Sequence, residues 1–165
     1  MEKGEHSGHL PVKINEVIRA LKPCDDGVYL DSTFGQGGYS EAILNAASTR
    51  VIGVDRDPAA VVFGKKLSSK YDGRLTILEG CFGNLERLLT THGILKVDGI
   101  AFDLGLSSVQ LDEPNRGFSF RFNGPLDMRM SSEGVTAADF VNNSSEKELA
   151  KIIQILGEER YARRI

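Results

Sequence analysis

The stretch VYLDSTFGQGGYSEAIL, residues 28–44, places a glycine-rich turn between an apolar run and a segment typical of a helix. A glycine turn that joins a strand to a helix often brings backbone N–H groups against a bound cofactor. This turn reads G-Q-G-G-Y-S at residues 35–40, which supplies only two of the three small residues of the dinucleotide fingerprint. The pattern therefore predicts a cofactor-binding turn without naming the cofactor.

Asp31, at the end of the apolar run, favours a cationic cofactor over a dinucleotide. A carboxylate would be repelled by a pyrophosphate, whereas it is stabilising beside the ammonium or sulfonium group of S-adenosylmethionine. Asp55 follows Gly35 by 20 positions and suits a carboxylate that accepts hydrogen bonds from ribose hydroxyls, but both cofactors carry such a ribose. Two alternatives stay open: the glycines could only make a tight turn, and Asp55 could cap the helix beginning at Pro58.

Apolar runs and helical patterns alternate along the first hundred residues. We expect strands near residues 28–32, 50–55, 74–79 and 97–103, and helices near 14–21, 38–47, 58–70 and 84–92. The strands are rich in Val, Ile and Leu rather than alternating, which is typical of a parallel sheet covered on both faces. The sequence therefore predicts an α/β fold with a doubly wound, Rossmann-like sheet.

Past Asp103 this alternation stops. Residues 105–134 contain four glycines, two prolines and no helical periodicity, so we expect a long ordered loop, a feature that usually has a function. Within it, Phe118, Phe120 and Phe122 could form the buried face of a hairpin that turns at Asn123-Gly124. After the loop, a capping box at Ser145 and Glu148 predicts a helix that Gly157 can end, and EERYARRI at 158–165 predicts another.

Composition excludes several classes of protein. The net charge of −3 argues against broad adhesion to nucleic acid, although a local basic surface is compatible with it. No apolar run approaches the roughly 18 residues of a membrane span, and the first residues lack the apolar core of a secretory signal. The two cysteines and three histidines show no disulfide or metal-site spacing. We expect a cytoplasmic protein with no membrane contact and no metal.

Six stretches carry a family resemblance: HLPV at 9–12, DSTFGQGGYS at 31–40, DRDP at 55–58, DLGLSSVQLD at 103–112, RGFSF at 116–120 and GPLDMRM at 124–130. In this order they resemble the MraW/RsmH family, which methylates the N4 amine of a cytidine in 16S ribosomal RNA of the small subunit. The resemblance runs to the end of the chain. Ser32, Tyr39 and Val109 depart from it, since the family commonly has glycine, histidine and proline there.

The resemblance implies S-adenosylmethionine as cofactor, a Rossmann-like methyltransferase sheet, and small-subunit ribosomal RNA or the assembled small subunit as partner. The cofactor contacts it implies are Gly37, Gly38, Tyr39, Asp55, Phe82, Asp103 and Gln110. For Phe82, a core position is an open alternative to contact with the adenine. The family's proteins continue well past residue 165, where they carry a motif around F-H-S-L-E-D, so this chain resembles a truncated N-terminal half with little or no turnover by itself.

Asp103 is also the best candidate for a catalytic residue, because it follows the fourth strand and faces the expected crevice. It could orient the substrate amine or hold the amino acid end of the cofactor, and the resemblance favours the second. A cap for the loop 105–108 is the structural alternative. Arg116, Arg121 and Arg129 interleave with aromatic residues, a pattern typical of contacts with unpaired RNA bases and phosphates.

These observations divide the chain into a partial cofactor-binding core at 1–104, a substrate loop at 105–134 and the start of a helical insertion at 135–165. A homodimer is possible, because the fourth strand would otherwise be an exposed apolar edge. Two other functions compete with a methyltransferase. An NAD-dependent oxidoreductase is disfavoured by Asp31, by Ser40 and by the lack of a catalytic His or Lys motif. A binding module without turnover stays open.

Overall fold

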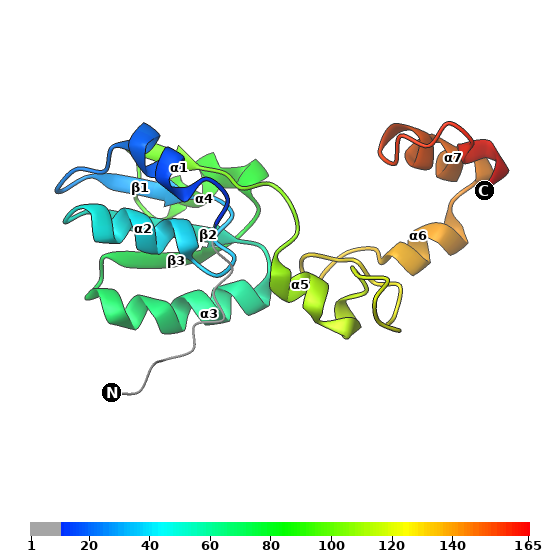
Figure 1. The fold of residues 1–165 in the computed structure, drawn as a ribbon, viewed down its shortest axis with the longest axis horizontal. Coiled ribbons are helices and arrows are strands. Elements are labelled where there is room, and N and C mark those ends of the chain that lie inside the picture. Colours follow the sequence, from blue (N-terminus) through cyan, green and yellow to red (C-terminus); the bar gives the residue numbers. More distant parts are fainter. Residues whose placement is uncertain (1–10) are drawn as a thin grey trace. The chain divides into compact units, whose positions relative to one another are not determined.

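A computed structural model describes residues 11–165 (Figure 1). They form two compact units, residues up to Ser108 and Val109–Ile165, which we describe separately. His9 and Leu10 of the HLPV stretch lie outside the described residues. Within residues 11–165, no helix is long and apolar enough to cross a membrane.

The first unit has the expected alternation of helices and strands. Its elements are α1 (Ile14–Leu21), β1 (Val28–Asp31), α2 (Gly38–Ala46), β2 (Arg50–Asp55), α3 (Pro58–Ser68), β3 (Leu75–Glu79), α4 (Leu85–Thr91) and β4 (Gly99–Ala101), with short 3-10 turns at Ser69–Tyr71 and Phe82–Asn84. All four predicted strands and four predicted helices are confirmed. β4 is shorter than expected, and within residues 11–165 it pairs on one side only, with β1.

The four strands form one parallel sheet in the order β3-β2-β1-β4. The chain proceeds from β1 outward through β2 to β3, and then returns to the other side of β1 to form β4. This reversal confirms the doubly wound α/β fold. In such sheets, ligands bind at the carboxyl ends of the strands where the direction reverses, which here is between β1 and β4. Asp31 and Ala101 are register partners at that point.

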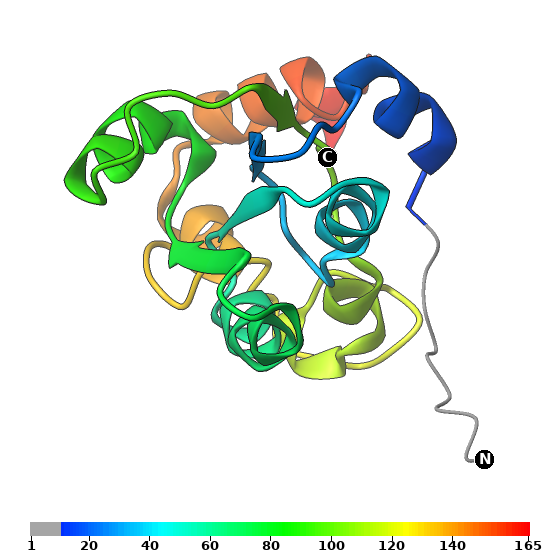
Figure 2. The ribbon, with the colours of Figure 1, turned by 90° about the vertical axis from the view of Figure 1, so that its left-hand side faces the viewer.

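Helices cover both faces of the sheet, but unequally. One core joins side chains of α1, α2 and α3 to Tyr29, Val51 and Leu75, while the other joins α4 to Leu30 and Val54. Figure 2 shows α4 on the opposite side of the sheet from α2. The expected apolar edge is confirmed, since β4 is terminal in the sheet and Ile100 and Phe102 are about half exposed.

The ring of Phe34 fills a slot that three glycines leave open. Phe34 belongs to the glycine turn and is buried, and its backbone N–H donates to the Val54 carbonyl over 3.0 Å. A Cβ atom added at Gly37 or Gly64 would lie 2.8 or 2.7 Å from this ring, and one added at Gly53 would lie closer still. The slot therefore locks the turn to β2 and α3 at once.

The second unit is helical and loop-rich. Its elements are α5 (Ser108–Asp112), a 3-10 turn at Pro114–Arg116, α6 (Ala137–Asn143), α7 (Glu146–Ile155) and a 3-10 turn at Ala162–Arg164. The capping box at Ser145 and Glu148 is confirmed at the start of α7. A second capping box, at Thr136 and Asp139, starts α6, which the sequence analysis did not predict.

One expectation for the second unit is only partly right, and two are wrong. Residues 117–134 contain no helix or strand, as expected of a long loop, but α5 and the Glu113-capped turn Pro114–Arg116 lie within the first part of the predicted range. The described loop contains no strand, so the hairpin does not form, and the side chain of Phe120 is 102% exposed rather than buried. The predicted helix after Gly157 is only a 3-10 turn, since Glu158 has a left-handed φ of 53° that interrupts helical geometry.

We predict that Gly53→Ala lowers the free energy of unfolding by about 1–3 kcal/mol, because the new methyl group overpacks the Phe34 slot. Chemical denaturation measures this change. Combining Gly53→Ala with Phe34→Leu should cost less than the sum of the two single substitutions, since the smaller side chain makes room. Gly105→Ala is the control, as an added Cβ atom there meets nothing within 4 Å. Strict additivity would contradict the slot.

Candidate functional site

The glycine turn is shaped by two residues with left-handed backbone, Gly35 and Gly37, with φ of 53° and 77°. Gly37 is the N-cap of α2 and offers no side chain to the first turn of the helix. The ring of Phe34 explains why Gly37 must be small, whereas a Cβ atom at Gly35 would meet only the Thr33 carbonyl at 3.9 Å. Packing within the protein thus explains the glycine at position 37. It does not explain the one at position 35, beside which there is open space.

Asp31 is fully buried behind this turn. Its Oδ2 accepts hydrogen bonds from the Oγ and the backbone N–H of Ser40, over 2.7 and 3.2 Å, which anchors the first turn of α2 to β1. Among residues 11–165, its Oδ1 has no hydrogen-bond partner, and neither has the buried Oγ of Ser32. Burial raises the pKa of Asp31 to about 6, although the hydrogen bonds from Ser40 partly oppose this shift. A buried acceptor without a donor is costly, so these atoms suit a ligand's polar groups.

Asp55 ties the end of β2 to the glycine turn. Its Oδ2 accepts from the Gly35 N–H over 2.7 Å, and its Oδ1 accepts from the Asp57 N–H over 2.9 Å. The N-cap of α3 is Asp57, whose side chain accepts from the Ala59 N–H. The alternative that Asp55 caps this helix is therefore wrong. Asp55 is half-buried, and its oxygens retain lone pairs for further donors.

Asp103 is exposed and lies near the turn through two contacts. Its backbone N–H donates to Thr33 Oγ1 over 2.8 Å, and its Oδ2 accepts from the hydroxyl of Tyr39 over 3.3 Å. The same hydroxyl lies 2.6 Å from the Val12 carbonyl, which it also reaches as a donor. Burial and the nearby Asp103 carboxylate raise the pKa of Tyr39, so the phenol stays protonated at neutral pH. The Tyr39 hydroxyl thus links Val12, which precedes α1, to Asp103, a predicted site residue.

Phe82 and Phe102 meet although they follow opposite edge strands, β3 and β4. Their ring centroids are 5.9 Å apart at an interplanar angle of 89°, an edge-to-face contact. Phe82 is 43% exposed, so the alternative of a core phenylalanine is wrong. The pair provides apolar surface near the carboxyl ends of the strands, as contact with an adenine requires.

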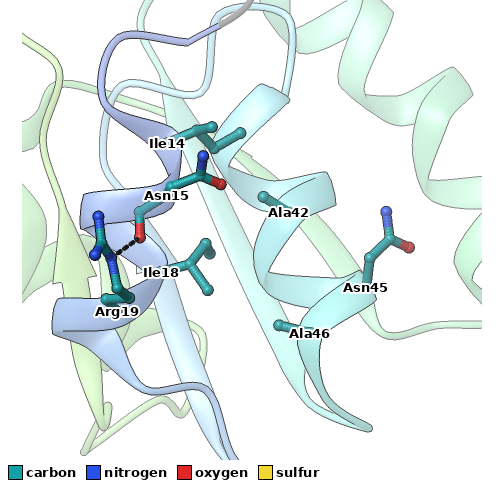
Figure 3. Close-up of a pocket in the computed structure, with 7 residues that line it drawn as sticks. All are labelled: Ile14, Asn15, Ile18, Arg19, Ala42, Asn45 and Ala46. Atoms are coloured by element: carbon teal, nitrogen blue, oxygen red, sulfur yellow. Dashed lines mark hydrogen bonds between the residues drawn. The ribbon is translucent and has the colours of Figure 1, made fainter.

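A groove elsewhere on the first unit separates α1 from α2 (Figure 3). Its lining residues are Ile14, Asn15, Ile18, Arg19, Ala42, Asn45 and Ala46. None of them is a predicted cofactor contact. The groove is therefore distinct from the cluster around the glycine turn.

The remaining predicted residues belong to the second unit. Gln110 is buried in α5. Arg116 donates to the carbonyls of Arg129 and Met130, both over 3.0 Å, and its guanidinium lies 5.8 Å from the ring centre of Phe118. Arg121 is exposed.

Arg129 is held on two sides. Its Nε and Nη2 donate to the two carboxylate oxygens of Asp127, over 2.9 and 2.7 Å, and its Nη1 donates to the Ser132 carbonyl over 3.0 Å. These bonds lower the pKa of Asp127 to about 2. Arg116 and Arg129 thus organise the loop itself, whereas Arg121 projects from it.

Sequence reasoning missed three partners of the site residues. Ser40 appeared only as an imperfect fingerprint residue, yet it holds Asp31. Thr33 positions Asp103, and Val12 shares the hydroxyl of Tyr39. Ser40 could have been found, since residue 40 lies in the first turn of α2, directly above the end of β1. The other two depend on contacts 70 and 27 residues apart in sequence, which no local pattern encodes.

Residues 6–165 match the MraW methylase family. The chain belongs to this family. It is 56% identical over 157 residues to "Ribosomal RNA small subunit methyltransferase H" of Rhodospirillum centenum, which covers 95% of this chain and 48% of that protein. Its identity to the protein of the same name from Rhodospirillum rubrum is 55% over 155 residues, or 94% of this chain and 48% of that protein. The chain spans about half the length of these relatives.

Among solved structures, an rRNA methylase from Streptococcus thermophilus superposes with a TM-score of 0.47 and 17% identity, over 59% of this chain and 58% of that one. The parallel sheet in the order β3-β2-β1-β4 shows the doubly wound α/β fold by itself. Membership of the MraW methylase family confirms the predicted family and indicates S-adenosylmethionine as the methyl donor.

The buried carboxylate gives the first unit a defined pH dependence. The pKa of Asp31 is about 6 when folded, against 3.8 as its ordinary value, so the folded state binds the proton more tightly. This contribution to stability is fully present below pH 4 and is lost as the pH rises through 6.

We therefore predict that Asp31→Asn is more stable than the parent at pH 7.5, by up to roughly 3 kcal/mol. The amide keeps an acceptor for Ser40 and carries no charge, so the difference should shrink between pH 6 and pH 4. Urea unfolding across this range measures it. The matched control is Glu86→Gln, at an exposed carboxylate on helix α4 of the same unit, which should show no such gain. Equal pH dependence in the parent and Asp31→Asn would contradict the prediction.

Proposed function

We propose that this chain is the cofactor-binding half of an S-adenosylmethionine-dependent methyltransferase that acts on the N4 amine of a cytidine in small-subunit ribosomal RNA. The observation that carries the proposal is the buried, unpartnered Oδ1 of Asp31 beside a glycine turn, with Asp55 and Asp103 close to the same turn. The names of the curated relatives support the class of substrate.

The residues present fit a cationic, ribose-bearing cofactor. Asp31 and Asp103 supply carboxylates for an ammonium group, and Asp55 has lone pairs for ribose hydroxyls. Phe82 supplies an exposed ring for an adenine, and we assign Gly37, Gly38, Tyr39 and Gln110 to the same site. When bound, S-adenosylmethionine supplies a methyl group activated by its sulfonium.

The proposed substrate, the N4 amine of a cytidine, is a weak nucleophile that an enzyme must activate. The lone pair of an exocyclic cytosine amine is delocalised into the ring, so the amine must be aligned and its hydrogen bonds accepted as charge develops. Asp103 is exposed, and Thr33 fixes its backbone, so its carboxylate is available as such an acceptor. We assign Asp103 first to the amino acid end of the cofactor and second to orientation of the amine.

Asp55→Ala should weaken binding of S-adenosylmethionine by about 1–3 kcal/mol, because it removes an acceptor from the ribose and from the Gly35 N–H. Isothermal titration with S-adenosylmethionine measures the loss, and Glu86→Ala, on helix α4, is an exposed control in the same unit. Unchanged affinity in Asp55→Ala would remove Asp55 from the site.

Titrating the parent with NAD tests the competing oxidoreductase, which tight NAD binding would favour. Methyl transfer to small ribosomal subunits separates an enzyme from a binding module.

We assign Arg116, Arg121 and Arg129 to the RNA side, with different roles. Arg121 is exposed, so Arg121→Gln should lower RNA affinity and reduce its salt dependence by about one phosphate contact. The hydrogen bonds of Arg116 and Arg129 imply that replacing either also loosens the loop, which amide hydrogen exchange would detect. Affinity for S-adenosylmethionine should not change in any of the three. RNA binding that is independent of salt would contradict this assignment.

The activity of this chain by itself follows from the same proposal. We infer that the chain corresponds to the N-terminal half of the relatives' length, and that it binds cofactor weakly and turns over little by itself. Two expectations stay predictions: association of two copies, for which the exposed edge of β4 is suited, and a cytoplasmic location.

A further inference from the structure

The loop between Pro114 and Ser132 is pinned at its base by close backbone approaches. Gly117 has a left-handed φ of 70°, and a Cβ atom there would collide with the Pro125 carbonyl. A Cβ atom at Gly124 would collide with the Pro114 carbonyl in the same way. The two arms of the loop therefore touch at two points, with residues 118–123 forming a tip between these contacts.

One backbone hydrogen bond and several side-chain bonds reinforce this base. The carbonyl of Arg116 accepts from the Met128 N–H over 3.0 Å, and its guanidinium donates to the carbonyls of Arg129 and Met130. The Asp127 carboxylate is paired with Arg129 over 2.7 Å. Two of the loop's three arginines are thus used to hold its shape, so the tip is presented on a rigid support.

The tip exposes its aromatic rings. Phe120 is 102% exposed and Phe122 is 44% exposed, with exposed Arg121 between them. Burying a phenylalanine ring stabilises a fold, so a fully exposed ring on a pinned loop forgoes that stabilisation. By contrast, Phe118 is half-buried and lies against the guanidinium of Arg116. The exposure is therefore a property of the tip and not of the whole loop.

The tip itself carries positive charge. Arg121 is the one charged residue of 118–123, whereas the carboxylates nearest in sequence, Asp112, Glu113, Asp127 and Glu133, belong to the base of the loop, where Asp127 is paired with Arg129. A partner that suits this surface is anionic and offers flat apolar groups. An unpaired nucleotide has both properties, since its base can stack on an aromatic ring while its phosphate meets a guanidinium.

We propose that Phe120, Arg121 and Phe122 form a stacking platform for an unpaired base of an RNA strand. This rests on the proposed function for the class of partner, but it assigns the contact to aromatic residues that neither the family match nor the fold specifies. Phe120 stacks on the base, Arg121 meets an adjacent phosphate, and Phe122 borders the platform. Arg116 and Arg129 act through the loop, as positioning residues.

A binding measurement with a fluorescent base tests the platform on the 165-residue chain. The probe is a short single-stranded RNA that carries pyrrolocytosine, whose emission is quenched when it stacks. The variants are Phe120→Leu, which keeps apolar bulk without a ring face, and Phe120→Trp, which keeps a face. The matched control is Tyr161→Leu. Tyr161 is 47% exposed in the same unit, but the guanidinium groups of Arg160 and Arg164 already lie 4.6 and 5.3 Å from its ring centre.

Phe120→Leu should lose the quenching and at least fivefold in affinity, in line with the strength of base stacking on one aromatic side chain. Phe120→Trp should retain both within about threefold, and Tyr161→Leu should match the parent. Equal losses in Phe120→Leu and Phe120→Trp would overturn the proposal, because they would indicate shape-specific packing against protein rather than stacking. Unchanged quenching in Phe120→Leu would also overturn it.

Titration with S-adenosylmethionine separates this proposal from the proposed function. A parent chain that binds S-adenosylmethionine but not the RNA overturns the platform and leaves the cofactor site standing. A chain that binds RNA through Phe120 but not S-adenosylmethionine supports the platform and contradicts the methyltransferase.

Discussion

Insertion of the Phe34 ring between three glycines is the contact on which the first unit depends. Gly37, Gly53 and Gly64 come from the turn, from β2 and from α3, and each leaves room for the same ring. The turn is therefore held against the sheet by close packing, in addition to its backbone conformation. With the turn fixed, the Gly35 N–H meets Asp55 and the first turn of α2 meets Asp31. The positions of the two carboxylates that define the candidate site thus follow from one aromatic side chain.

Most of the first unit could be predicted because its signals are local. Val-, Ile- and Leu-rich runs gave the four strands, and Pro58 marked the first turn of α3. The doubly wound class of the sheet followed from the alternation of strands and helices, whereas the strand order itself came from the structure. The exact role of Asp31 was harder to obtain. Its charge indicated a cationic cofactor. Its burial and its bond to Ser40 depend on how closely α2 packs against β1, and this packing could not be predicted from a local sequence pattern.

The second unit was less predictable, for identifiable reasons. α5 is five residues long, too short to show a helical period. The alternation of Phe118, Phe120 and Phe122 matched a strand, but the contacts of Gly117 with Pro125 and of Gly124 with Pro114 bend the chain into a closed loop instead. The arginines were recognised as a group, although their bonding partners differ. Arg116 and Arg129 hold the loop because backbone carbonyl groups lie within reach of their guanidinium groups, whereas Arg121 is exposed. The positions of carbonyl groups cannot be recognised from a sequence pattern.

Tyr39 has a consequence that concerns communication along the chain. A phenol carries one proton, so its hydroxyl can donate fully to the Val12 carbonyl or to the Asp103 carboxylate, but not to both at the same moment. A molecule that supplies its own donor to Asp103 removes one competitor for that proton and leaves it to Val12. Binding of a ligand to the Asp103 carboxylate and the hydrogen bond between Tyr39 and the Val12 carbonyl are then linked. Thermodynamic reciprocity requires each of the two to favour the other. An imidazole at position 39, as is common in the family, would divide its protons differently, so this linkage belongs to the tyrosine.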